Sequence, residues 1–354
     1  MLLIYQKMVR NGDVFETYLK TNRAAKGIEH THTRIGSKEL KLPGGSYVIH
    51  LENQTELLNR YYDHVWSQGN MEYLTERQLI ENGPVLVDID LRYPPEIEKR
   101  QHSDEHLLDA VIMYADKFIE LYDIPNNGEL EVYVLQKKNV NRLDTVTKDG
   151  VHIIFGVQMH KAVQCLVRNY LVQALGECWD GLPIINSWSD VIDEGVTKGH
   201  VNWQLYGSRK PGNEAYALYK HYTLVCRDSE WEPQENAIEA ISIKDTLPRL
   251  SARCTDWPVW EVRSDRKEEI DKTLSEFKSG PRKRRLVVQP RQTPVKTDPI
   301  QYLALLRAGQ SPTMTEHALD EILDELYSST AACDYSLKET HQYVMCLPET
   351  YYGP

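Results

Sequence analysis

Two aspartates spaced two residues apart are the first residues of this sequence that could do chemistry. Asp88 and Asp90 lie in PVLVDIDLRY (84–93), directly after an apolar run. Side chains at positions i and i+2 of a strand face the same side, so we expect both carboxylates to leave the end of a buried strand together. Like charges so close repel each other, and an Mg²⁺ or Mn²⁺ ion would let both stay ionised. An isolated D-x-D is also typical of a strand that ends in water.

A second group of polar residues lies in KDGVHIIFG (148–156). Lys148 and His152 flank Gly150, which allows the backbone to approach a ligand closely. A lysine, a glycine turn and an imidazole can together donate to a phosphate group. The alternative is that His152 is a hydrogen-bonded structural residue at the start of a strand.

The third group lies in VIDEGVTKGHVNWQLYGSRKPG (191–212). Asp193 offers a third carboxylate, which can complete a site for two metal ions. The side chains of Ser208, Arg209 and Lys210 on a turn can hold a triphosphate. Taken alone, these three residues are better explained as a solvated basic turn, and it is the order of all three groups that favours a site.

The elements that must position these residues alternate between strands and helices, which predicts an α/β or α+β core. Ser103 is the expected N-cap of a helix, and Asn126-Asn127-Gly128 the expected turn into the next strand. Helices are expected over 53–68, 104–123, 158–179 and 266–278, and strands over 84–91, 129–136, 148–156, 202–212 and 215–227.

Composition limits the function classes. The chain has 354 residues, of which 41% are hydrophobic, enough for one large domain or two ordinary ones. The net charge of −11 argues against coating nucleic acid through overall charge, but not against a local basic groove. No apolar run approaches the ~20 residues of a membrane span, and no secretory signal is visible. The six scattered cysteines indicate reduced thiols of an intracellular protein.

The order of the three groups resembles the archaeo-eukaryotic primase superfamily. Its pattern is an apolar strand into D-x-D or D-x-E, then a small residue-x-His before an apolar strand, then an apolar-Asp. Primase-polymerase members add a strand and turn like R-L-Y-x-S-x-K. This sequence has VDID at 87–90, GVHIIF at 150–155, ID at 192–193 and QLYGSRK at 204–210. Within the superfamily it looks most like the N-terminal module of primase-helicases of nucleocytoplasmic large DNA viruses, and THTRIG (31–36) and YLTER (73–77) support that narrower match.

The resemblance implies a role for each matching residue. Asp88, Asp90 and Asp193 match the metal-binding carboxylates that catalyse nucleotidyl transfer with two Mg²⁺ or Mn²⁺ ions, and His152 matches a nucleotide-contacting histidine. Further nucleotide-binding positions are Lys148, Gly150, Ser208, Arg209 and Lys210. Two positions depart from the family: Gly150 stands where many members have serine, and Gln204 where related enzymes often have arginine.

The implied fold is an N-terminal αβ module packed on an RRM-like module, with a C-terminal extension. We expect a primase-polymerase catalytic domain over 1–279, a basic proline-containing linker over 280–300, and a short helical extension over 301–354 that leads toward a helicase region of the full-length chain. The implied partners are single-stranded DNA template and NTP or dNTP, in the host cytoplasm at a viral replication site. Candidate template contacts in the linker are Arg282, Lys283, Arg284 and Arg285, although a solvated linker explains them as well.

Two hypotheses from other classes stay open. A D-x-D glycosyltransferase would also place Mn²⁺ and a nucleotide diphosphate at a strand end, although it does not need the ordered His and SRK motifs. A non-catalytic nucleic-acid-binding module would leave the acids as a solvated strand end. Metal-dependent primer synthesis on unprimed single-stranded DNA separates both hypotheses from a primase.

Overall fold

The structure is a computed structural model that describes residues 14–279, which belong to one compact unit. The predicted linker 280–300, the extension 301–354 and the basic residues Arg282 to Arg285 lie outside the described residues and stay predictions.

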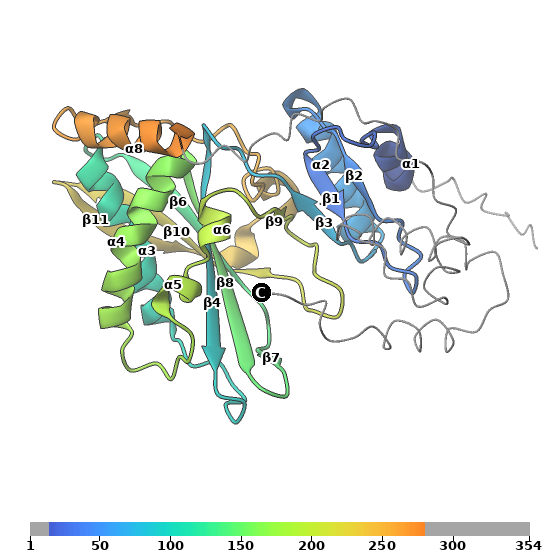
Figure 1. Ribbon diagram of the computed structural model, residues 1–354, viewed down its shortest axis with the longest axis horizontal. Helices are drawn as coiled ribbons and strands as arrows, with labels where there is room; N and C mark the ends of the chain where they lie inside the picture. Colours follow the sequence, from blue (N-terminus) through green and yellow to red (C-terminus); the bar gives the residue numbers. More distant parts are fainter. Residues whose placement is uncertain (1–13, 280–354) are drawn as a thin grey trace, which may run out of the picture. The chain divides into compact units, whose positions relative to one another are not determined.

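The centre of the fold is a six-stranded antiparallel sheet (Figure 1). Its strand order is β11-β10-β6-β8-β4, and the short β7 pairs with β8. The strands are β4 (Gly83–Tyr93), β6 (Glu129–Gln136), β7 (Asn141–Arg142), β8 (Thr147–Met159), β10 (Ala217–Arg227) and β11 (Glu230–Asn236). The sequence did not predict β11, which is a mostly exposed partner of β10 at the edge of the sheet.

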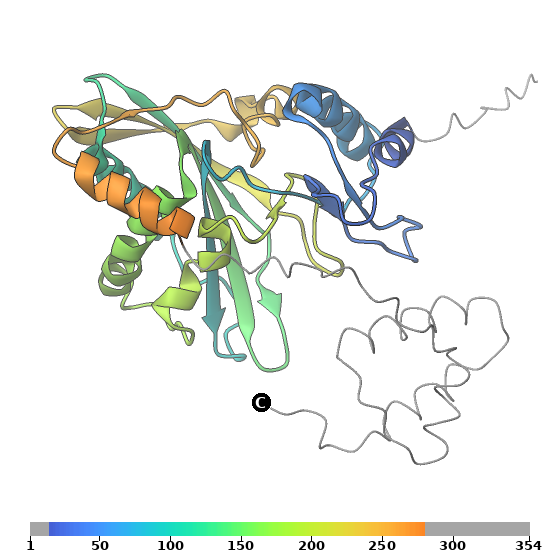
Figure 2. The ribbon, with the colours of Figure 1, turned by 45° about the horizontal axis from the view of Figure 1, so that its top comes forward.

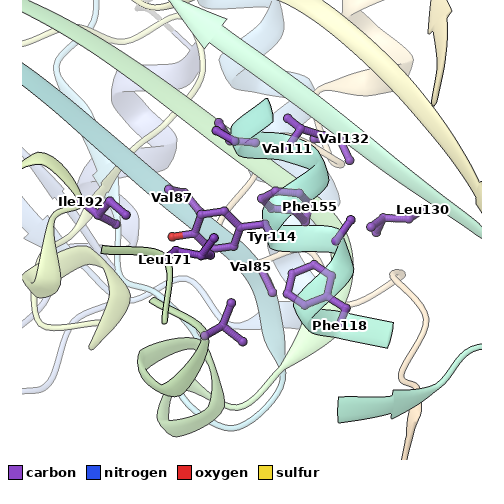
Figure 3. Packing of buried hydrophobic residues seen from close by; sticks show 14 of the residues in the cluster. Val85, Val87, Val111, Tyr114, Phe118, Leu130, Val132, Phe155, Leu171 and Ile192 are labelled. Atoms are coloured by element: carbon purple, nitrogen blue, oxygen red, sulfur yellow. The ribbon is translucent and has the colours of Figure 1, made fainter. Parts of the chain in front are cut away.

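Two long helices, α3 (Asp104–Leu121) and α4 (Lys161–Cys178), cover one face of this sheet, and α8 (Lys267–Ser279) lies along α4 (Figures 1 and 2). In the core beneath α3, Tyr114 and Phe118 pack on Phe155 of β8, with ring centroids 5.3 and 5.4 Å apart (Figure 3). The Ser103 side chain accepts a hydrogen bond from the backbone N–H of His106, which confirms it as the N-cap of α3.

Alternation along β4 separates the two faces of the sheet. Val85, Val87, Ile89, Leu91 and Tyr93 are buried in the cluster that includes α3 and α4. The residues between them therefore face the opposite side of the sheet. On that side Leu86 belongs to a second buried cluster, and Asp88 and Asp90 are the next residues along β4 that face the same way. The expectation that the aspartates lie at the end of the strand is wrong, because β4 continues to Tyr93.

An N-terminal lobe, residues 14–76, contributes to a second sheet of order β2-β1-β3-β9. Its buried Arg34 forms two hydrogen bonds with Glu72, at 2.9 and 2.6 Å. Glu76 accepts hydrogen bonds from the Ser251 hydroxyl and the Ala252 backbone, which ties the lobe to the rest of the chain. The lobe and its partner strand comprise α1 (Val14–Thr21), β1 (His32–Arg34), β2 (Gly45–Tyr47), η1 (Leu51–Asn53), α2 (Gln54–Tyr62), the π-helical turn η2 (Asp63–Ser67), β3 (Leu74–Glu76) and β9 (Trp203–Gln204).

The observed α+β class, with helices on an antiparallel sheet, confirms the predicted fold class. The helix expected over 158–179 begins at Lys161, because the strand before it runs to Met159. Among the described residues, no helix has the length and apolarity needed to cross a membrane. The remaining elements are β5 (Tyr122–Asp123), α5 (Trp188–Val191), α6 (Glu194–Thr197), η3 (Ile238–Ala240), α7 (Ile243–Thr246) and β12 (Glu261–Val262).

The contact between α3 and the sheet gives a first prediction. Phe155→Ala should lower the free energy of unfolding by about 3–5 kcal/mol, because a fully buried ring is removed from between two aromatic neighbours. Ile185→Ala is the control, since that side chain is 57% exposed and its loss should change stability by less than about 0.5 kcal/mol. Denaturant unfolding of both variants measures the difference, and equal losses would contradict the described core.

Candidate functional site

Antiparallel pairing places the first two predicted groups on one face of the sheet. In the register of β4 and β8, Asp88 lies opposite His152 and Asp90 lies opposite Gly150. Paired residues of antiparallel strands point their side chains to the same face. Lys148 lies on this face too, two residues beyond Gly150. The structure therefore brings together residues that are about sixty positions apart in the sequence.

The third carboxylate arrives along the other edge of β4. The Asp193 backbone N–H donates to the Asp88 carbonyl at 2.9 Å. Further along the same edge, the Asn186 amide donates to the Asp90 carbonyl at 2.9 Å. Arg168 of α4 holds this segment from behind, because its Nε donates to the Ile192 carbonyl at 2.9 Å. We refer to residues 185–193 as the edge segment.

Mutual repulsion among the carboxylates is visible in the titration of Asp88. Its pKa is raised from 3.8 to about 7, mainly by burial and then by the negative charges of Asp193 and Asp90. The other two carboxylates have local partners. Asp90 forms an ion pair with Arg92 at 3.0 Å, and Asp193 Oδ1 accepts from the Val196 backbone at 2.8 Å.

Two lysines oppose this negative charge. Lys210 and Lys137 both lower the pKa of Asp88, which places their ammonium groups near the carboxylates. Burial and the charge of Lys210 in turn lower the pKa of Lys137. Lys210 was predicted, but Lys137 was missed because it follows β6 without any motif. One signal in the sequence could have identified Lys137: it directly follows the buried strand β6, which is adjacent to β8.

His152 is a nearly buried member of an aromatic stack. Its ring lies 3.6 Å from that of Tyr216 and 4.2 Å from that of Trp203, measured between centroids. Burial, followed by the charges of Lys137 and Lys210, holds the pKa of His152 well below its usual value, so the imidazole is neutral. Its Nε2 lies 3.7 Å from Asp88 Oδ1. The neighbour that the structure assigns to His152 is thus a carboxylate, and its nucleotide contact stays a prediction.

The turn after β9, which contains Ser208 and Arg209, is hydrogen-bonded to the N-terminal lobe. The buried Ser208 hydroxyl bonds with the Tyr61 hydroxyl at 2.8 Å and accepts from the Leu74 backbone at 3.1 Å. The Arg209 backbone donates to the Glu72 carbonyl at 3.0 Å. The hydroxyl of Ser208 is therefore used in packing, while the exposed Lys210 extends beyond the turn.

Gln204, a position where the sequence departs from the expected arginine, has a role in the same turn. Its side-chain amide donates to the Ser208 carbonyl. Gly207 has φ +88°, and a Cβ at this position would lie 2.6 Å from the Trp66 ring. Both residues thus shape the turn that carries Lys210.

Carboxylate oxygens on one face have the chemistry that Mg²⁺ and Mn²⁺ prefer. Burial is the main cause of the raised pKa of Asp88, and the neighbouring negative charges that add to it are the charges that such an ion would neutralise. In the described residues, however, no group of three or more His, Cys, Asp or Glu side chains is arranged to hold a metal. Arg92 is hydrogen-bonded to one carboxylate oxygen of Asp90, Oδ2, so a bound ion would share this carboxylate with Arg92 or displace it.

A protein-family model matches the part of the chain that contains these residues. The model of the C962R protein N-terminal AEP (archaeo-eukaryotic primase) domain matches residues 37–222, just over half of the chain, including the three carboxylates, His152 and Lys210. A protein of Acanthamoeba polyphaga mimivirus named "Putative helicase L207/L206" is 27% identical over 199 residues, which are 55% of this chain. The matched part spans only 19% of that relative.

The carboxylate repulsion gives a second prediction, for the metal-free protein. Folding raises the pKa of Asp88, so its stabilising contribution is complete below about pH 4 and is lost as the pH rises to about 7. In Asp88→Asn the side chain cannot ionise, so the stability that the wild type loses as the pH rises is retained. The variant should exceed the wild type by about 1–2 kcal/mol in free energy of unfolding at pH 8 and by little at pH 4.

Chemical unfolding in the presence of a chelator at both pH values measures this difference. Asp144→Asn is the matched control, because Asp144 is exposed. The assignment is wrong if Asp88→Asn and Asp144→Asn behave alike at pH 8.

Proposed function

Because the chain belongs to the archaeo-eukaryotic primase family, we propose that it is a DNA-dependent primase-polymerase. The reaction is transfer of a nucleotidyl group from NTP or dNTP to a 3′-hydroxyl on a single-stranded DNA template, with release of pyrophosphate. One observation carries the proposal: Asp88, Asp90 and Asp193 are held on one face by backbone pairing, beside two lysines. This arrangement joins a cation-binding surface to a phosphate-binding one.

In this proposal the three carboxylates hold two Mg²⁺ or Mn²⁺ ions. When bound, such ions lower the pKa of the attacking hydroxyl and neutralise the leaving pyrophosphate. The protein supplies the positions of the carboxylates, because each is fixed through its own backbone to β4 or to its edge. The near-neutral pKa of Asp88 means that ion binding competes with a proton there.

Lys137 and Lys210 would bind the triphosphate. Both are close enough to Asp88 to affect its titration, so they border the carboxylates rather than a distant surface. Ammonium groups fixed beside the transferred phosphate stabilise the negative charge that develops there. Lys148 lies further along the same face and would extend the binding surface, while Ser208 and Arg209 hold the turn of Lys210 in place.

The wider context is also a proposal. The mimivirus relative carries helicase in its name, and the match covers a fifth of its length. We propose that this chain is the priming module of a longer primase-helicase that acts in viral DNA replication. Template binding by Arg282 to Arg285 stays part of this proposal.

Loss of the carboxylates tests the reaction. Asp88→Asn and Asp90→Asn should each reduce primer synthesis on unprimed single-stranded DNA by more than about a hundredfold, because charge stabilisation of this kind is worth at least that factor. Labelled NTPs and dNTPs are supplied separately, with Mg²⁺ and with Mn²⁺. Asp144→Asn should retain full activity. Synthesis that survives the double variant would exclude the metal-ion role, and transfer from a sugar nucleotide instead would indicate a glycosyltransferase.

Substitution of Lys137 tests whether this residue binds the phosphates of the nucleotide. Lys137→Ala should raise the KM for nucleotide about tenfold or more, since one hydrogen bond to a charged phosphate is lost. The kcat should fall as well, because that charge grows in the transition state. Lys138→Ala is the control, because Lys138 is the neighbouring lysine and is exposed. Equal effects of the two substitutions on KM would remove Lys137 from the nucleotide site.

A further inference from the structure

Tyr216 places a hydroxyl where residue 150 lacks a side chain. A Cβ added to Gly150 would lie 2.3 Å from the Tyr216 hydroxyl oxygen, 3.3 Å from its Cζ and 3.6 Å from its Cε1. The φ angle of Gly150 is not positive, so its backbone would allow a side chain, and only the steric contact with Tyr216 prevents one. The tyrosine hydroxyl thus occupies the volume that a side chain at position 150 would need.

The ring of Tyr216 is held on two sides. One face stacks on His152 at 3.6 Å, with 19° between the ring planes. The Lys137 Nζ lies 5.0 Å from the ring centroid, a cation–π distance. Such contacts fix the direction of the hydroxyl, so its position is set before any ligand arrives.

The hydroxyl itself has no hydrogen-bond partner within the described part of the chain, and Tyr216 as a whole is partly buried. Burial and the charges of Asp88 and Asp90 hold the pKa of Tyr216 well above its usual value, so the group remains a donor. A fixed donor without an acceptor, beside Lys137, is suited to an anionic ligand.

We propose that the Tyr216 hydroxyl donates a hydrogen bond to a phosphate oxygen of the incoming nucleotide, in the place of the side chain that Gly150 lacks. The inference rests on the proposed function, since it concerns the nucleotide of that reaction. It assigns a nucleotide-binding role to a residue outside the motifs that the sequence revealed.

The pair Gly150 and Tyr216 can be tested as a unit. Tyr216→Phe should leave the melting temperature unchanged and raise the KM for nucleotide about tenfold. Gly150→Ser alone should lower both the melting temperature and the activity, because its Cβ collides with the hydroxyl oxygen. In the double variant the nearest ring atom is at 3.3 Å, so the serine is accommodated after the ring moves by a few tenths of an ångström, and it supplies a new hydroxyl. Stability and KM should then return toward wild-type values.

Tyr219→Phe is the matched control on the same strand. Its hydroxyl donates to Asp104 at 2.6 Å, outside the site, so its loss should not change the KM. Additive losses in the double variant would overturn the proposal, as would an unchanged KM in Tyr216→Phe.

Binding of inorganic tripolyphosphate and of ATP, measured by calorimetry, identifies the group contacted. Tyr216→Phe should weaken both to a similar extent, and weakening of ATP alone would overturn the phosphate assignment in favour of the sugar. The proposed function is tested separately. A wild type that binds tripolyphosphate through Tyr216 but synthesises no primer would refute primase activity and leave the phosphate site intact. A wild type that synthesises primer without any effect of Tyr216→Phe would refute only the phosphate site.

Discussion

Backbone pairing on both edges of β4 is the constraint on which the site depends. One edge is hydrogen-bonded to β8 and the other to the edge segment that ends at Asp193. These bonds do not involve side-chain charge, so the fold holds three carboxylates together against their repulsion. Burial raises the pKa of Asp88 most, and the negative charges of Asp193 and Asp90 raise it further. Cations bound to this face would relieve the repulsion among the carboxylates. The same repulsion that destabilises the metal-free protein therefore favours ion binding.

The opposing positive charge depends on a different part of the chain. Lys210 lies on a turn whose backbone is bonded to Glu72, and the side chain of Glu72 is paired with the buried Arg34. The N-terminal lobe therefore positions a site residue although it supplies none of the carboxylates. Removing one partner of a buried ion pair is strongly destabilising. A substitution of Arg34 would for this reason disturb the turn that carries Lys210.

Sequence reasoning found the site residues that lie in continuous motifs. Alternation in 84–93 revealed that Asp88 and Asp90 share a face, since a period of two is a local property of the chain. Register was not predictable, because the pairing of β4 with β8 depends on packing beneath α3 and α4. Lys137 and Tyr216 were missed for the same reason: each reaches the site through tertiary contacts alone. The strand β11 was missed because its exposed, charged residues and Pro233 lack the usual strand pattern.

The neutral state of His152 follows from what surrounds it. A protonated imidazole here would add positive charge beside Lys137 and Lys210 in a nearly buried stack, and burial opposes it further. A neutral ring keeps one N–H donor, and Nε2 is directed at Asp88 from 3.7 Å. Because Trp203 and Tyr216 pack against the ring and fix its plane, the distance from Nε2 to the Asp88 carboxylate is set by this packing. The packed imidazole is therefore a neutral neighbour of Asp88, and the positive charge that lowers the pKa of that carboxylate comes from Lys210 and Lys137.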